Sequence, residues 1–492
     1  MSQPAPAAPP ERRVAVVGGG VAGLVAACEL VEWGHGVAGV PWRVYVIEAD
    51  GRFGGKIATS RLRGLVIEAG ADSMLSAKPQ ALEWCRRLGL MDRVVNTRTE
   101  DRRTFVWSRG RLRELPEGLV LGSPARAGAL LRSGLLSPWG AARMALDVAV
   151  PARRDRAEES LASFFTRRLG REAFERVVEP LLAGIHAGDA TRLSLQATFP
   201  RFAEMERQHG GLVRATLAAR QRDDQAPAGQ APAGHTPFIS LENGLAELTE
   251  ALVDRLRRSG AELMTGGAVT AIRAGPGDGL PGGGGYEVVL EGGSHLTVDA
   301  VVLATPAPVT ARLVASLCPP AAGLLQSIPH VSTATVSLAY SDLDRPPEGY
   351  GFVVPRVEQR DLIAATWSSQ KWPGRAPPGQ VLVRGYVGGA GRESVLEADD
   401  DSLVRLVRAE LFAMAGIAGR PVYAEVHRYP EGMPQYTIGH AARVERIRAE
   451  LSGWPGLAVT GAAYGGVGIP DCIADATAAA GSVLAGLAVP VR

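Results

Sequence analysis

Short, uninterrupted apolar runs alternate with amphipathic stretches along this chain. The runs at 14–17, 42–48 and 299–306 are rich in valine, alanine and isoleucine and end at turn residues. Such runs predict strands that are buried on both faces, as in a parallel sheet whose strands are joined by helices. The run at 80–88 spaces its apolar residues by three and four, which predicts an amphipathic helix instead.

The order of these patterns predicts an α/β fold built from three parts. A discontinuous, Rossmann-like nucleotide-binding domain is expected, together with a mostly helical cap of membrane-associated type and a mixed-sheet, mainly antiparallel substrate domain. The expected boundaries are 11–75, 238–310 and 452–490 for the nucleotide-binding domain, 76–222 for the cap and 311–451 for the substrate domain. The stretch 223–237 repeats alanine, proline and glycine, which is typical of a flexible linker.

The first strand runs into a glycine-rich turn that indicates nucleotide binding. Gly18, Gly20 and Gly23 have the spacing G-x-G-x-x-G between an apolar strand and a helix. The first glycine permits the tight turn, the second lets a pyrophosphate approach the backbone, and the third lets the helix pack closely on the sheet. The helix N-terminus then offers free N–H groups to the phosphates. The expected contacts are Gly18, Gly19, Gly20, Val21, Ala22 and Gly23.

An acidic residue and a second glycine pair follow. Glu48 ends the second strand, where a carboxylate in this type of unit binds a ribose hydroxyl. Gly54 and Gly55 come shortly afterwards and would let another loop approach the same cofactor. Taken alone, a glycine pair is also typical of an ordinary β-turn. The expected cofactor contacts in this part are Glu48, Ala49, Gly55, Lys56, Gly70, Ala71, Asp72 and Ser73.

The C-terminal region repeats the arrangement of strand, glycine loop and helix. The strand at 457–461 is followed by a loop with Gly465, Gly466 and Gly468 and then by an alanine-rich helix. This copy lacks the acid-tipped second strand of a separate nucleotide site, so we expect both ends of the chain to bind one extended cofactor. The expected contacts are Gly461, Val467, Gly468 and Ile469.

From its first strand to about residue 486, the chain resembles the FAD-binding flavin amine oxidase superfamily. The glycine motif, the acid and the trailing glycine pair carry the general resemblance. Further segments are similar to those of the oxygen-dependent protoporphyrinogen and coproporphyrinogen oxidases of haem synthesis, namely 179–189, 238–245, 354–356, 371–373, 433–436 and 465–472. The resemblance also implies cofactor contacts from Val269 and Thr305.

This resemblance implies an FAD-dependent oxidase that converts a porphyrinogen to the porphyrin in haem biosynthesis. Six electrons would pass to three molecules of O2, giving H2O2, with FAD bound non-covalently. Aromatisation supplies the driving force, and the sequence offers no convincing nucleophile, dyad or triad, so no catalytic side chain is assigned. The resemblance implies a cavity wall formed by Gly184, Ala187 and Gly188. It implies substrate contacts from Arg103, Gly184, Ile185 and Met433.

The anchor for the substrate's propionate groups departs from the family pattern. The family carries an arginine just before a Gly-x-Leu-x-x-Leu-Pro turn, but that position is Thr104 here, with Arg103 beside it. Arg103 is the candidate, because a guanidinium binds a carboxylate bidentately. The overall pattern favours coproporphyrinogen III, with four propionates, over protoporphyrinogen IX, with two. His186 stands where the family commonly carries an aromatic ring, which favours a space-filling role over that of a base.

Composition and charge exclude several other classes. The chain has 492 residues, of which 46% are hydrophobic and 21% charged, and its net charge of +2 gives no case for nucleic-acid binding. The four cysteines are far apart and form no Cys-x-x-Cys pair, which argues against a disulfide reductase and against a metal site. Reduced thiols and an N-terminus without an apolar signal core favour the cytoplasm.

Partners and rival functions stay open at this point. The stretch 119–156 mixes apolar residues with arginines, which fits either a basic helix on the inner membrane surface or the solvated face of a cap helix. The expected partners are the porphyrinogen, O2 and haem-pathway enzymes such as a ferrochelatase, and the protein is expected to be a monomer or homodimer. One rival is another amine oxidase or carotenoid desaturase, and the other is a non-catalytic FAD-binding partner of the haem pathway.

Overall fold

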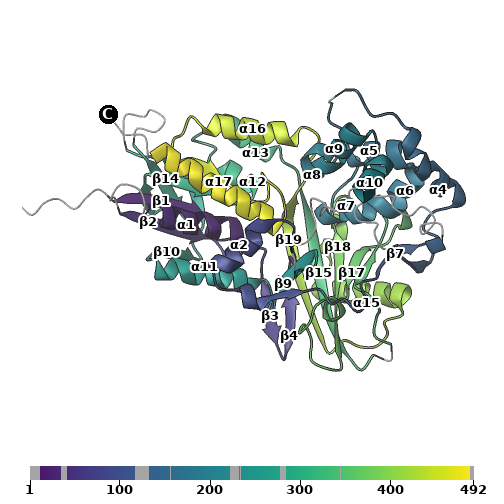
Figure 1. The fold of residues 1–492 in the computed structure, drawn as a ribbon. Coiled ribbons are helices and arrows are strands. Elements are labelled where there is room, and N and C mark those ends of the chain that lie inside the picture. Colours follow the sequence, from purple (N-terminus) through teal and green to yellow (C-terminus); the bar gives the residue numbers. More distant parts are fainter. Residues whose placement is uncertain are drawn as a thin grey trace, which may run out of the picture.

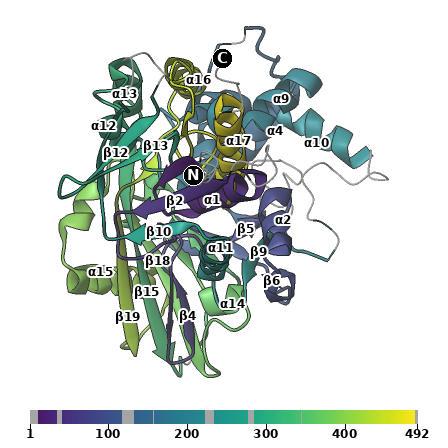
Figure 2. The same ribbon diagram turned by 90° about the vertical axis from the view of Figure 1, so that its left-hand side faces the viewer.

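A computed structural model of the chain describes residues 11–34, 41–116, 132–155, 157–221, 232, 234–276, 284–343 and 345–487. Two halves lie side by side, a nucleotide-binding half on the left of Figure 1 and a half with a large sheet and a helical cap on the right. Figure 2 shows the first half from its outer side. Most of the expected linker, 222–231, and the first part of the basic stretch, 119–131, lie outside the described residues.

Five parallel strands form the first sheet, in the order β10–β2–β1–β14–β20. They are β1 (Arg12–Val17), β2 (Trp42–Glu48), β10 (Glu262–Thr265), β14 (Ala300–Leu303) and β20 (Leu457–Val459). The predicted buried strands are confirmed, including the C-terminal one. Because all five strands run in the same direction, the loops that follow them meet at one edge of the sheet.

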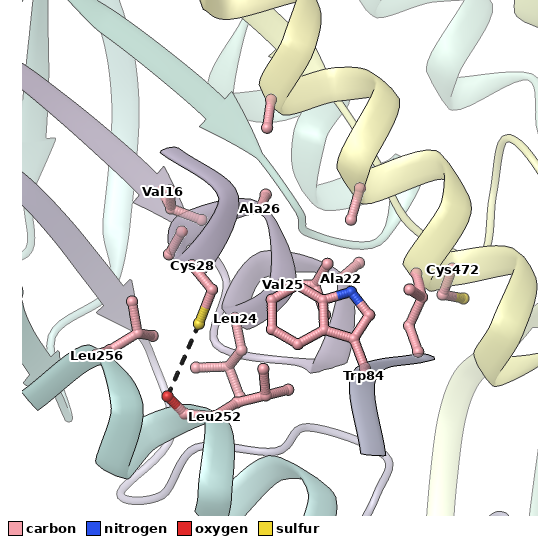
Figure 3. Close-up of a cluster of buried hydrophobic side chains, with 14 of the residues drawn as sticks. Val16, Ala22, Leu24, Val25, Ala26, Cys28, Trp84, Leu252, Leu256 and Cys472 are labelled. Carbon is pink, nitrogen blue, oxygen red and sulfur yellow. Dashed lines mark hydrogen bonds between the residues drawn. The ribbon is translucent and has the colours of Figure 1, made fainter. Parts of the chain in front are cut away.

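Helices on one face hold the two glycine loops together. α1 (Val21–Gly34) packs against α17 (Ile469–Leu487) and α11 (Ala246–Arg258), and α2 (Pro79–Arg87) packs on α17. Figure 3 shows Val25, Trp84 and Cys472 gathered between these helices, with the Cys28 thiol directed at the Leu252 carbonyl oxygen. Burial of this apolar surface keeps the first turns of α1 and α17 side by side.

A second layer covers the opposite face and changes a predicted boundary. It contains α12 (Ala307–Leu313), α13 (Pro319–Gln326), α16 (His440–Leu451) and an antiparallel sheet of β11 (Val269–Ala274), β12 (Tyr286–Leu290) and β13 (His295–Val298). Their apolar side chains share a core with Ala15 and Ile47 of the parallel sheet. The boundary predicted at 311–451 is therefore corrected at both ends, because 311–328 and 440–451 pack on the nucleotide-binding half.

The other half centres on a seven-stranded sheet in the order β19–β15–β18–β17–β16–β7–β8. Its strands are β7 (Thr104–Ser108), β8 (Arg111–Glu114), β15 (His330–Ser341), β16 (Gly351–Val353), β17 (Leu362–Thr366), β18 (Gln380–Gly388) and β19 (Tyr423–Pro434). All neighbours are antiparallel except β16 with β7. α15 (Asp400–Ala415) covers one face, and the mixed, mainly antiparallel sheet is confirmed.

The segment 76–222, predicted to be mostly helical, also contains strands β7 and β8 of the large sheet. In β7, Val106 and Ser108 are buried while the residues between and before them are partly exposed, which is the alternation of a strand. Arg109 and Gly110 both have positive φ and turn the chain back into β8. These strands are only 5 and 4 residues long, so they are inconspicuous between longer amphipathic runs.

Several small elements connect the two halves. β3 (Thr59–Leu62) and β4 (Leu65–Glu68) form a hairpin. β6 (Val94–Asn96) and β5 (Met74–Leu75) pair with β9 (Phe238–Leu241) on its two sides, and α14 (Ser368–Lys371) precedes β18. All four cysteines are buried and unpaired, in agreement with the sequence prediction of free thiols.

The helical cap lies above one end of the large sheet (Figure 1). It consists of α4 (Pro138–Ala145), α5 (Leu161–Leu169), α6 (Arg171–Ala173), α7 (Glu179–His186), α8 (Leu195–Thr198), α9 (Pro200–His209) and α10 (Leu212–Gln221). Arg168 is fully buried in it and pairs with Asp147 at 2.5 Å and with Glu206 at 3.1 Å. α7 contacts β16 and β17, so it forms the boundary between cap and sheet. None of the helices in the described ranges is long and apolar enough to cross a bilayer.

Candidate functional site

The loop after β1 contains glycines with two kinds of surroundings. A Cβ on Gly18 would lie 2.8 Å from the Ala304 carbonyl oxygen, and a Cβ on Gly23 would lie 1.8 Å from the Gly18 carbonyl oxygen. Packing of α1 on the sheet therefore requires glycine at both positions. A Cβ on Gly20 would meet nothing within 4 Å. Gly20 thus borders open space at the first turn of α1, where backbone N–H groups have no partner within the helix.

Glu48 lies beside this loop, as the sequence predicts. Its Oε2 accepts the N–H of Gly19 at 2.6 Å, and its Oε1 accepts the N–H of Asp50 at 2.9 Å. Each carboxylate oxygen can accept two hydrogen bonds and accepts one from these groups, so both keep a lone pair for a ribose hydroxyl. Gly55 approaches from the other side, and a Cβ on it would lie 3.2 Å from the Gly20 Cα.

The remaining predicted contacts of this region lie around the same edge. Val21 and Ala22 form the start of α1, and Ala49 follows the last residue of β2. The backbone nitrogen of Thr305 would lie 3.3 Å from a Cβ on Gly18. Val269 is the first residue of β11. Two residues before it, the Gly267 N–H donates to the Glu48 carbonyl oxygen at 3.4 Å.

The C-terminal glycine loop reaches this edge from β20. Gly461 has a φ of +123°, and a Cβ there would meet nothing within 4 Å. Asp475 Oδ2 accepts the Gly461 N–H at 3.0 Å and the Thr460 hydroxyl at 2.9 Å, which fixes the start of the loop on α17. Val467 and Gly468 directly precede Ile469, the first residue of α17.

The loop after β2 extends to the second sheet. The Lys56 ammonium donates to the carbonyl oxygen of Gly432 on β19. Lys56 is exposed to solvent, yet partial burial of its ammonium group lowers the pKa of that group. The register of β19 on β15 shifts between Val331 and Thr333. The predicted substrate residue Met433 pairs with Val331 at this bulge and directly follows Gly432, the residue that Lys56 contacts.

Charged side chains hold the predicted cofactor segment 70–73 on β18. Asp72 pairs with Lys371 at 3.1 Å and with Arg384 at 3.5 Å. Burial alone would raise the pKa of Asp72, but these two cations outweigh it and hold that pKa well below its ordinary value. Arg384 also donates to the Gly70 carbonyl oxygen at 2.9 Å. The segment consists of Gly70, Ala71, Asp72 and Ser73, and the Ser73 hydroxyl donates to Asp72 at 2.7 Å.

α7 supplies the wall that the sequence predicts at 184–188. A Cβ on Gly184 would meet nothing within 4 Å, whereas a Cβ on Gly188 would lie 2.4 Å from Gln435 Oε1. Ala187 directly follows α7 and has a φ of +46°, and its carbonyl oxygen accepts the N–H of Ala390 at 2.9 Å. Gly184, Ala187 and Gly188 line one cavity, so the structure brings the predicted wall together.

The end of β19 joins the cofactor loops to this wall. Gln435 Nε2 donates to the His186 carbonyl oxygen at 2.9 Å, and the Tyr436 hydroxyl donates to the Ala462 carbonyl oxygen in the C-terminal loop. Gly432 of β19, together with Gln435 and Tyr436 just after the strand, thus contacts both cofactor loops and the cap. Of this segment, the sequence predicts only Met433 as a contact, and the similarity of 433–436 to a family segment is the signal for the others.

Two predicted substrate residues have surroundings that differ from the wall. Arg103 forms ion pairs with Asp101 and Glu348, each at 2.8 Å, so carboxylates of the protein already occupy its guanidinium. Ile185 is next to Gly184 but is 47% exposed. Both remain predictions, because no contact of either side chain with the Gly184 cavity supports them.

His186 fits the space-filling interpretation. Its ring lies in an aromatic cluster with Phe199 and Tyr436, at centroid distances of 5.9 and 5.6 Å. Burial lowers its pKa to about 4, so the ring is neutral at pH 7. Its Nδ1 has no hydrogen-bond partner within the described ranges.

The open faces of Gly20 and Gly461, with Glu48 and the first turns of two helices beside them, fit the phosphates and ribose of a dinucleotide. Residues 21–484 match the sequence profile of the family described as "Flavin containing amine oxidoreductase". The chain belongs to this family. It is therefore an oxidoreductase of the flavin type.

Two named relatives and one solved structure add to this family match. The chain is 35% identical to the coproporphyrinogen III oxidase of Bacillus subtilis, over 96% of this chain and 98% of that one. It is 29% identical to the chloroplastic protoporphyrinogen oxidase 1 of Arabidopsis thaliana, over 94% of this chain and 86% of that one. Its fold is similar to a putative protoporphyrinogen oxidase from Exiguobacterium, with a TM-score of 0.84, 30% identity and coverage of 97% and 99%.

Proposed function

We propose that this flavoprotein oxidises coproporphyrinogen III to coproporphyrin III in haem biosynthesis, using FAD and O2. The observation that best supports this function is the open face of Gly184, which lines a cavity. The end of β19 and the residues after it link the wall of this cavity to Lys56 and to the C-terminal glycine loop. A macrocycle that becomes planar on oxidation can lie close to a flavin only if the facing wall carries no protruding side chain. The names of several relatives at 32–35% identity support the choice of substrate.

The proposed roles of the residues are binding and exclusion of water. When bound, FAD supplies the two-electron oxidations, and O2 restores it. Gly20, Glu48 and Gly461 hold the dinucleotide, and Lys56 with Met433 borders its reactive end. Gly184 leaves room for the macrocycle, and His186 fills the space behind the wall as a neutral ring. No side chain is assigned as a general base, because aromatisation drives the reaction.

FAD is proposed to be bound without a covalent link. Cys472 is the thiol nearest to the C-terminal glycine loop, with its Sγ 3.5 Å from the Gly466 carbonyl oxygen. Burial raises its pKa to about 12, with the charges of Asp471 and Asp475 adding to that effect. A buried thiol that stays protonated is a poor nucleophile, which supports non-covalent binding.

We propose a cytoplasmic enzyme whose cap touches the inner face of a membrane. Buried free thiols are typical of reducing compartments. Trp139 is 85% exposed on α4, and Leu146 and Val148 are exposed just after this helix. Exposed apolar side chains of this kind suit contact with a lipid surface. Flotation with phosphatidylglycerol vesicles tests this contact, and Trp139→Ser should weaken it. Gel filtration of the protein alone tests whether it is a monomer or a homodimer. Gel filtration of a mixture with a ferrochelatase tests whether the two proteins associate.

The decisive assay compares coproporphyrinogen III and protoporphyrinogen IX with the FAD-loaded protein, under air and under nitrogen. Porphyrin fluorescence and three H2O2 per porphyrin should appear under air, faster with coproporphyrinogen III. Faster turnover of protoporphyrinogen IX would reverse the substrate preference. Absence of porphyrin from both substrates, with FAD bound, would overturn the function and favour an amine oxidase, a desaturase or a flavin-binding partner without turnover.

A further inference from the structure

Two arginines line the same cavity as Gly184, Ala187 and Gly188. Arg356 follows β16 and Arg392 follows β18, and both belong to the cavity wall. The cavity has a volume of about 40 Å³. Since one water molecule needs about 15 Å³ on this measure, the space suits a group of carboxylate size rather than a whole macrocycle.

Contacts with backbone oxygens orient both guanidinium groups. The Arg356 side chain donates to the Ala390 carbonyl oxygen, and Arg392 Nη2 donates to the Arg356 carbonyl oxygen at 3.2 Å. Within the part of the chain that the structure describes, no carboxylate oxygen lies within 4.0 Å of either guanidinium. Each guanidinium has five N–H donors, so several remain for a ligand. Arg103, in contrast, already has its two carboxylates.

The local charge balance favours an anion. Glu179 is the carboxylate in the cavity wall, and its Oε2 accepts the backbone N–H of Arg356 at 3.3 Å. Two further carboxylates lie outside the wall: the charge of Asp189 raises the pKa of Glu179, and the charge of Asp361 raises the pKa of Arg392. Burial raises the pKa of Glu179, which favours its neutral form. Burial and the charge of Arg356 both lower the pKa of Arg392. A bound carboxylate would relieve this uncompensated positive charge.

We infer that Arg356 and Arg392 bind a propionate carboxylate of the porphyrinogen at the end of the wall formed by Gly184. This assignment rests on the proposed function. The open face of Gly184 and both guanidiniums border the same cavity, so a macrocycle lying on Gly184 has a propionate directed at the pair. Arginine forks bind carboxylates bidentately, which selects for substrates rich in propionates. The pair supplies the anchor that Thr104 cannot.

The test replaces both arginines with glutamine and compares the Arg356→Gln/Arg392→Gln protein with a charge-matched control, Arg405→Gln/Arg420→Gln, on the exposed surface around α15. The KM for coproporphyrinogen III should rise about tenfold or more, as should the Kd for the product coproporphyrin III. The FAD content should stay at the wild-type level and kcat should change less than KM. Lysine at both positions should restore part of the affinity, because it keeps the charge without the fork.

A ligand without carboxylates completes the test. Wild-type protein should bind coproporphyrin III more tightly than its tetramethyl ester, and this ratio should shrink in the double variant but not in the control. If the double variant does not fold, each single glutamine variant should raise the Kd about threefold or more. Unchanged KM, Kd and ester ratio, in variants of an enzyme whose wild type produces porphyrin, would overturn the anchor. A wild type that produces no porphyrin would instead overturn the proposed function.

Discussion

The cofactor edge and the α7 wall both depend on glycine, but each region contains glycines of two kinds. At the cofactor edge, Gly23 is enclosed by the protein's own backbone, whereas Gly20 faces open space. At the wall, Gly188 is enclosed by Gln435, whereas Gly184 faces open space. An enclosed glycine serves packing, and an open one leaves room for a ligand. Substitutions at matched positions therefore separate damage to the fold from damage to binding.

Gly23→Ala should have the largest effect. The added Cβ would lie 1.8 Å from the Gly18 carbonyl oxygen, so α1 must move away from the sheet. Overpacking of this kind costs about 3 kcal/mol in the free energy of unfolding. Urea denaturation of the apoprotein measures that loss, and absorbance near 450 nm should show that FAD is lost as well. Wild-type stability with normal FAD content would contradict the enclosed position of Gly23.

Gly184→Leu should abolish most turnover without damaging the fold. A Cβ at this position meets no described atom within 4 Å, so stability and FAD content should match the wild type. Because the leucine fills the place of the macrocycle, kcat/KM for coproporphyrinogen III should fall about a hundredfold or more.

Gly188→Ala is the matched control for Gly184→Leu. Its Cβ would meet Gln435 Oε1 at 2.4 Å and Leu193 Cδ1 at 2.8 Å, so it should lower the free energy of unfolding by about 1–3 kcal/mol. Normal turnover of Gly184→Leu would show that the substrate does not lie on this wall.

The pH dependence of stability probes the buried ring behind the wall. Native His186 has a pKa of about 4, whereas an unfolded histidine has a pKa of about 6.5. Between these values the unfolded state binds the additional proton, so stability is retained above about pH 6.5 and lost as the pH falls towards 4. The loss from this ring is about 2 kcal/mol at pH 5. His186→Phe should reduce the difference in unfolding free energy between pH 7 and pH 5 by that amount.

The exposed His295 gives the control for this measurement. His295→Phe should leave the difference between pH 7 and pH 5 as in the wild type. An equal effect of both substitutions would contradict the burial of His186 in a neutral form.

Gly20→Ala should have the smallest effect of these substitutions, and it should change FAD binding without changing stability. Its Cβ meets nothing of the protein within 4 Å, so the apoprotein should unfold as the wild type does. The methyl group instead stands where a pyrophosphate approaches the backbone, and the Kd for FAD should rise about tenfold. Fluorescence titration with FAD measures this change. Unchanged affinity would show that the phosphates lie elsewhere.

The cofactor edge was predictable because its information is local in the sequence. Gly18, Gly20 and Gly23 occupy one turn, Glu48 ends the next strand, and parallel pairing brings their loops together by rule. The C-terminal loop was equally predictable from the sequence, because a strand, glycines and a helix follow each other directly. The membership of β7 and β8 in the large sheet was not predictable, because it depends on pairing β7 with β16, far away in the chain.

The substrate side was only partly predictable for the same physical reason. Gly184 and Met433 came from resemblance, but the contact of Gln435 with α7 joins segments far apart in the chain, which no local pattern reveals. The sequence pointed to Arg103 because it neighbours the expected position. Its ion pairs, and the cavity with Arg356 and Arg392, arise from loops separated by long stretches of chain.

The central claim is that both chain ends hold one flavin and that α7 and β19 hold a tetrapyrrole against it. A crystal structure of the FAD-loaded protein with coproporphyrin III tests this claim most directly. The account predicts a dinucleotide passing Gly20 and Gly461 and a porphyrin resting on Gly184, between α7 and the flavin ring. A porphyrin bound away from Gly184, or a flavin that touches only one of the two glycine loops, would contradict it.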